Sequence, residues 1–153
     1  MNRRALLCTT AFLPVLGLIG CGGQTASQIA ADVNLIASGL TAAVAQIGQI
    51  PEVPSAALTQ IDFYLATIQA DAAKIARATS TPATSTVQEI GQVVQALASV
   101  VLPLVPTGSV IEATVQAAVS LLPVILAAAG VSGAGVPAKY RPAQARAILA
   151  AFR

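Results

Sequence analysis

Apolar residues recur every three or four positions through four long segments of this chain, and proline or glycine interrupts the pattern between them. Such spacing places the apolar residues on one face of an α-helix, whereas a half-buried strand needs strict alternation. The repeating positions are Ile29, Val33, Ile36, Leu40, Ala43, Ile47 and Ile50; Leu58, Ile61, Leu65, Ile68, Ala72 and Ile75; Val87, Ile90, Val94, Leu97, Val101 and Leu104; and Ile111, Val115, Ala118, Leu122, Ile125 and Ala129. The sequence therefore predicts an all-α protein.

The breaks between these segments are short and rich in proline. They fall at residues 51–54, 79–85 and 106–108. Short connections make consecutive helices antiparallel neighbours, and Ser55 and the Ser109–Glu112 pair have the sequence pattern of helix N-termini. We therefore expect an antiparallel four-helix bundle over residues 28–130, followed by a glycine-rich linker and a short C-terminal helix within residues 131–153.

The first residues have the composition of an export signal. Arg3 and Arg4 give a positive start, and a mostly apolar run follows over residues 5–19. This run is shorter than the about 20 residues that span a bilayer, so it favours a secretory signal peptide over a membrane helix. The paired arginines are also typical of twin-arginine signals, which leaves two export routes open.

The end of this run contains a more specific motif. Leu18-Ile19-Gly20-Cys21 resembles the lipobox of bacterial lipoproteins, in which aliphatic and small residues precede an obligatory cysteine. The resemblance implies that signal peptidase recognises Leu18, Ile19 and Gly20 and removes residues 1–20. Cys21 would then carry the acyl chains, such as palmitate, that anchor the protein to the membrane, with residues 21–27 as lipidated cysteine and tether.

The residue after Cys21 bears on localisation. In Gram-negative lipoproteins, which the motif resembles, Asp at this position favours retention in the inner membrane. Gly22 stands there instead, so the resemblance implies an outer-membrane protein facing the periplasm. Beyond the lipobox, the mature part is only loosely similar to short alanine-rich helical lipoproteins of unassigned role.

Charged and reactive side chains are scarce. Only 9% of residues are charged and 3% aromatic, which argues against a nucleic-acid partner because such binding needs basic patches and stacking aromatics. Removal of Arg3 and Arg4 would leave six basic and six acidic side chains, with no histidine and no close pair of carboxylates for acid–base chemistry. We expect no enzyme, no cofactor and no metal. The spacing of Asp71, Lys74 and Arg77 predicts ordinary surface charge pairing.

The C-terminal segment differs from the rest because it is basic. Lys139, Arg141, Arg146 and Arg153 lie in it, and no acid follows Glu112. Two interpretations stay open. The segment forms a small helix that closes the bottom of the bundle, or its basic residues contact anionic lipid or a partner protein.

A long stretch of low charge raises a membrane alternative. Within residues 78–138 the charged residues are Glu89 and Glu112. Residues 90–111 and 113–138 are each long enough to span a bilayer. Against insertion, polar residues form stripes typical of helices half exposed to water, namely Gln88, Gln92, Gln95 and Ser99, and Glu112, Gln116 and Ser120.

Three functions follow from these patterns. The first is a lipid-anchored envelope protein with a structural or interaction role, which binds an envelope protein or self-associates. The alternative is a membrane-active phage-type protein, a holin, lysis or exclusion factor, with the third and fourth helices inserted in the bilayer. A carrier of apolar ligands has weaker support, from the apolar surface of the fourth helix.

Overall fold

A computed structural model describes residues 25–80, 82–131 and 138–152 of the chain. Regular structure in these ranges is entirely helical, and no strand occurs within them, so the all-α prediction is confirmed. The elements are α1 (Ala26–Ile47), α2 (Ser55–Arg77), α3 (Thr84–Val101), the short 3₁₀-helix η1 (Leu102–Leu104), α4 (Val110–Ala128) and α5 (Pro142–Ala151).

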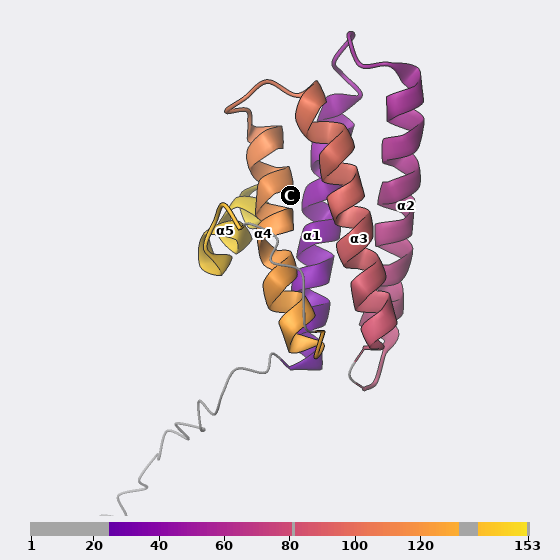
Figure 1. Cartoon of the computed structure of the whole chain (residues 1–153), viewed down its shortest axis with the longest axis vertical. Helices are drawn as coiled ribbons and strands as arrows, with labels where there is room; N and C mark the ends of the chain where they lie inside the picture. The colour runs from indigo at the N-terminus through magenta and orange to yellow at the C-terminus, as the bar shows by residue number, and fades with distance from the viewer. Residues whose placement is uncertain (1–24, 81, 132–137, 153) are drawn as a thin grey trace, which may run out of the picture.

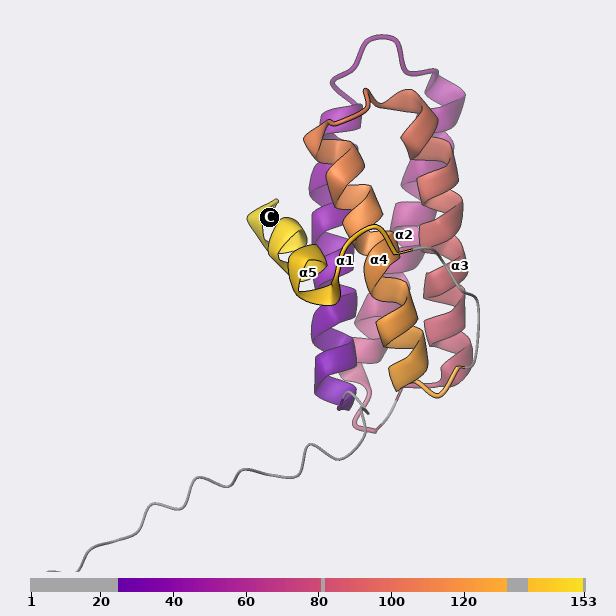
Figure 2. The same ribbon diagram turned by 60° about the vertical axis from the view of Figure 1, so that its left-hand side comes forward.

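The four long helices lie side by side (Figure 1). α1 packs against α2 and α4, and α3 packs against the same two helices. The start of α1, the α2–α3 connection and the end of α4 lie together at what we call the entry end, and the other two connections lie at the distal end (Figures 1 and 2). α5 lies against the outside of α4 and α1, near the middle of their length.

The repeating apolar positions form the interior. All of them are buried except Ile50, Leu58, Leu104 and Ala129, which are half-buried. Each fully buried Val, Leu or Ile contributes about 1.5–3 kcal/mol relative to an exposed one. The contacts between these helix faces, rather than the loops, therefore stabilise the fold.

Local signals fix the helix ends. Thr25 Oγ1 accepts a hydrogen bond from the Gln28 amide, while Gln28 Oε1 accepts one from the Thr25 amide at 2.9 Å, which completes a capping box at α1. Ser109 Oγ accepts a hydrogen bond from the Glu112 amide at 3.1 Å, as the sequence predicts. The expected cap of α2 is wrong by one position, because Pro54 is the N-cap and Ser55 the first helical residue.

Three helical stretches are long and apolar enough to cross a membrane. They are Ala26–Ile47, Thr84–Leu104 and Val110–Ala128, judged by length and composition. The first was not among the stretches that the sequence pattern indicated. α3 nevertheless exposes the side chains of the predicted polar stripe, Gln88, Gln92, Gln95 and Ser99.

Candidate interaction site

The lipobox residues lie outside the part of the chain that the structure describes. This holds for Leu18, Ile19, Gly20 and Cys21, and also for Arg153 at the other terminus. Lipidation at Cys21 therefore stays a prediction. The structure does describe Thr25, where the chain enters α1, and the residues by which the C-terminal segment attaches to the four long helices.

A bidentate ion pair joins α5 to α1. Arg146 Nε donates to Asp32 Oδ1 at 2.8 Å, and Arg146 Nη2 donates to Asp32 Oδ2 at 2.7 Å. Asp32 is only 5% exposed, whereas the Arg146 side chain remains 39% exposed. The hydrogen bond to Asp32 raises the pKa of Arg146, against the smaller effect of burial. Paired hydrogen bonds between ionised groups are both strong and geometrically specific.

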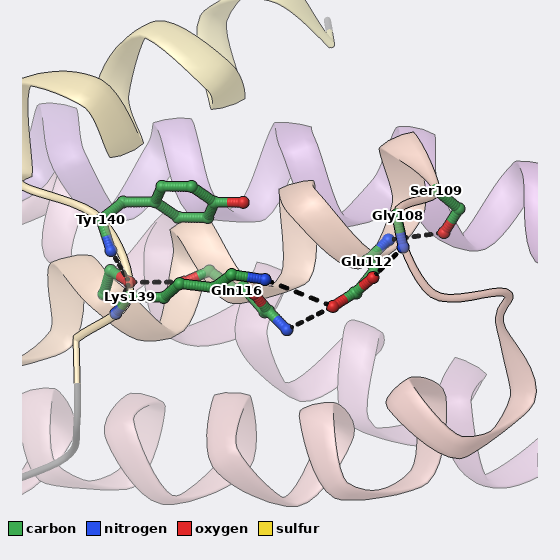
Figure 3. A network of polar contacts seen from close by, with 7 residues as sticks. Gly108, Ser109, Glu112, Gln116, Lys139 and Tyr140 are labelled. Atoms are coloured by element: carbon green, nitrogen blue, oxygen red, sulfur yellow. Dashed lines mark hydrogen bonds and ion pairs between the residues drawn. The ribbon is translucent and has the colours of Figure 1, made fainter.

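The chain that leads into α5 is attached to α4 through its backbone. Ser120 Oγ accepts hydrogen bonds from the amides of Lys139 and Tyr140, at 3.1 and 3.2 Å, and donates to the Gln116 carbonyl at 2.7 Å. Figure 3 shows this segment lying along α4. One hydroxyl group thus satisfies two backbone donors that would otherwise lack a partner in the contact.

Glu112 provides a second polar attachment, at the start of α4. Its carboxylate accepts hydrogen bonds from the Gly108 amide and, at 2.7 Å, from Gln116 Nε2, and Lys139 Nζ lies 3.5 Å away (Figure 3). The pKa of Glu112 is lowered first by the Gly108 hydrogen bond and then, despite some desolvation, by Lys139 and Gln116. The carboxylate is therefore held in its ionised form.

These contacts correct the expectation that Glu112, Gln116 and Ser120 form a stripe facing water. Glu112 and Gln116 are half-buried and Ser120 is buried. The reason is that the segment before α5, which follows a glycine-rich stretch of sequence, folds back over this face. The stripe is a contact between parts of the chain.

The apolar side of α5 packs closely on α1. Ala145 and Leu149 are fully buried. A Cβ atom placed on Gly39 would lie 2.6 Å from Leu149 Cδ2, so the Leu149 side chain would have to shift if Gly39 were replaced. Gly39 therefore lies in the part of α1 that contacts Leu149 of α5.

The position of α5 differs from the predicted one. One of the two interpretations placed the small helix at the bottom of the bundle, but α5 lies along the flank of α1 and α4 (Figure 2). Of the predicted contact residues, Lys139 and Arg146 face Glu112 and Asp32, respectively. Arg141 precedes α5 and is exposed, and its amide donates to Gln144 Oε1 at 3.2 Å.

Asp71 of α2 is a second buried carboxylate, and the expected charge pairing is present for Asp71 and Lys74 but does not include Arg77. Asp71 is 1% exposed, and its Oδ1 accepts a hydrogen bond from Lys74 Nζ at 2.6 Å. Its Oδ2 is buried without a hydrogen-bond partner among the described residues. Arg77 forms no ion pair within the described part of the chain, so the predicted trio reduces to one pair.

Three residues of this attachment were not expected from the sequence, namely Asp32, Ser120 as an acceptor, and Gly39. A signal existed for Asp32, because it directly precedes the interior residue Val33 and so lies beside the buried face of its helix. The ranges that the structure describes contain no cluster of three or more metal-ligating side chains. Comparison with protein-family models, with curated proteins and with solved structures gives no match for this chain.

Proposed function

We propose that this chain is an exported bacterial lipoprotein with a non-enzymatic, structural or interaction role in the cell envelope. Signal peptidase removes residues 1–20, and acyl chains on Cys21 hold the protein at the outer membrane, facing the periplasm. The mature domain is an antiparallel four-helix bundle with α5 attached to its flank. Its exposed faces bind an envelope protein or a second copy of the chain.

The observation that supports a water-exposed mature domain is that few large apolar side chains lie on its surface. The chain is 56% hydrophobic, yet the large apolar side chains with high exposure among the described residues are Phe63 and Val110. A helix surrounded by lipid has no need to bury its apolar residues against neighbouring helices. The burial pattern therefore supports a domain that folds in water and depends on an attached lipid for its membrane association.

Metabolic labelling tests the anchor. The full precursor, expressed in a lipoprotein-processing bacterial host, should incorporate labelled palmitate, and mass spectrometry should give Cys21 as the modified N-terminal residue. Cys21→Ser should abolish the label, while the matched variant Cys8→Ser should retain it because Cys8 lies in the removed signal. Label that persists in Cys21→Ser would contradict the proposal.

A membrane-active phage-type protein, with α3 and α4 inserted, is the second candidate. The observation that favours it is that Thr84–Leu104 and Val110–Ala128 each have the length and hydropathy of a membrane span. Gln92→Cys separates the two candidates, because Gln92 is exposed in the folded domain. Rapid reaction of this thiol with a membrane-impermeant maleimide supports the lipoprotein, and protection until detergent is added supports insertion.

A further inference from the structure

The position where the chain enters α1 restricts how a lipid on Cys21 could hold the domain. Three residues separate Cys21 from Thr25, the N-cap of α1. Consecutive Cα atoms are 3.8 Å apart, so these four steps span at most about 15 Å. An acylated Cys21 would therefore keep the entry end of the domain near the bilayer surface.

The last turn of α2 lies at this same end. A shallow groove is lined jointly by Ala26 and Ala30 of α1 and by Ile75, Ala78 and Thr79 at the end of α2. Figures 1 and 2 show the α2–α3 connection beside the start of α1. Whatever surface lies next to the start of α1 consequently also faces the end of α2.

The charged side chains described at the entry end balance one another, because Lys74 and Arg77 are matched by Asp71 and Glu89, but Arg77 is the member of this group that can contact an anionic headgroup directly. Lys74 is balanced by Asp71, which raises its pKa, and to a lesser extent by Glu89. Arg77, the last residue of α2, is exposed and has no ion pair within the described part of the chain. The exposed residues that follow it, Ala78 and Thr79 among them, are uncharged. At the distal end Glu52 is an exposed acid, which an anionic surface would repel.

We propose that the entry end rests on the lipid headgroups, and that Arg77 contacts headgroup phosphate. This inference depends on the proposed lipidation of Cys21, and its partner is a phospholipid surface that contains anionic lipid. The distal end then faces away from the headgroups, toward the periplasm, and α5 lies on the flank between the two ends. In this arrangement the lipid contact belongs to α2, while Lys139 and Arg146 serve the attachment of α5.

Two labelling positions test the orientation. After cleavage the only native cysteine is Cys21, which the acyl chain blocks. Thr79→Cys and Glu52→Cys, each expressed as the full precursor, therefore give the processed protein a unique site for a fluorophore. These residues flank α2, whose 23 residues extend about 34 Å. In vesicles of phosphatidylcholine and phosphatidylglycerol with a headgroup-nitroxide lipid, we expect strong quenching of the probe at Thr79 and little at Glu52.

Equal quenching at the two sites, or stronger quenching at Glu52, would overturn the orientation. The mass of the reconstituted protein distinguishes this failure from failure of the proposed function. A protein that carries the acyl chains but shows the wrong quenching contradicts the orientation alone, whereas a protein without acyl chains contradicts the anchor itself.

The contribution of Arg77 is measured by lipid composition. A basic side chain at an anionic surface changes the equilibrium about five-fold. Replacing phosphatidylcholine with phosphatidylglycerol should therefore increase quenching of the Thr79 probe in the native background and not in Arg77→Gln. The matched variant Arg141→Gln, on the flank, should respond like the native background. If Arg77→Gln and Arg141→Gln lose the same part of the increase in quenching that phosphatidylglycerol causes, Arg77 has no specific role.

Discussion

Asp32 in α1 and Asp71 in α2 lie at equivalent positions relative to the apolar pattern of their helices, but their carboxylates have different partners in the fold. Each directly precedes an interior residue of its helix and each is buried. Asp32 directs both carboxylate oxygens to Arg146 of α5, 114 positions away. Asp71 contacts Lys74, three positions away, and leaves Oδ2 without a hydrogen-bond partner among the described residues.

The difference shows what fixes α5 in place. A buried carboxylate that is satisfied only by its own helix carries no information about the position of another helix. A carboxylate on the outer flank of α1, with both oxygens bound by one guanidinium group, does. Together with Ser120 and Gly39, Asp32 therefore marks on the four long helices the place where the C-terminal segment attaches.

The largest effect in this comparison is expected for Asp32→Ala. Breaking a fully buried ion pair costs about 3–5 kcal/mol of folding free energy. Because the Arg146 side chain is 39% exposed and remains hydrated, we expect the free energy that holds α5 in place to fall by about 2 kcal/mol. Hydrogen exchange should report it as faster exchange of the α5 amides. Unchanged protection of α5 would show that the pair does not hold it.

Ser120→Ala should have the next largest effect. It leaves the Lys139 and Tyr140 amides without their acceptor, at a cost of about 1–2 kcal/mol, unless water replaces it. Urea denaturation measures the change. Ser99→Ala is the matched control, because Ser99 is exposed on α3 and bonds only within its own helix. If the free energy of unfolding falls equally in both variants, the hydrogen bonds of Ser120 to the Lys139 and Tyr140 amides do not stabilise the attachment.

Asp71→Ala should change the free energy of unfolding by no more than about 1 kcal/mol, since Lys74 is largely exposed and exposed pairs contribute little. Removal of an unsatisfied buried oxygen offsets part of that loss. A double-mutant cycle with Lys74→Ala should give a weaker coupling than the cycle of Asp32 and Arg146. The reverse order would contradict the comparison.

The smallest effect is expected from acid. The pKa of Glu112 lies below its ordinary value of 4.5 in the folded protein, so its contacts stabilise the fold above that pH and are lost as the pH falls through the folded pKa. The pKa of Arg146 is raised, and that contribution disappears only in strong alkali. We therefore expect the NMR chemical shifts of the Lys139 and Tyr140 amides to stay constant between about pH 6 and about pH 9. They should change when the pH falls below 4.5 and Glu112 becomes protonated. In Glu112→Gln the acid change should be absent.

The interior of the four long helices was predictable from sequence, because apolar spacing alone determines which face a helix buries. The set from Val87 to Val101 is buried as expected, and the glutamines between its members are exposed. Helix starts were predictable to within about a turn, since Ser109 caps α4 while Pro54 takes the place expected of Ser55.

The attachment of α5 was not predictable in the same way. It depends on pairing between residues far apart in the chain, such as Asp32 with Arg146, which periodicity does not encode. Gly39 resembles any other helical glycine until Leu149 lies against it. The charge of the C-terminal segment did not show that Lys139 and Arg146 pair with acids, because those acids lie in other helices.

The most direct test of the account is the behaviour of residues 22–153, expressed without signal peptide or lipid and kept free of detergent. The account predicts that this fragment enters solution as a helical, monodisperse species, measured by circular dichroism and sedimentation. Its apolar helix faces would then be buried against one another, and the acyl chains alone would attach the native protein to the membrane. A fragment that enters solution only with detergent would contradict this account and place α3 and α4 in the bilayer.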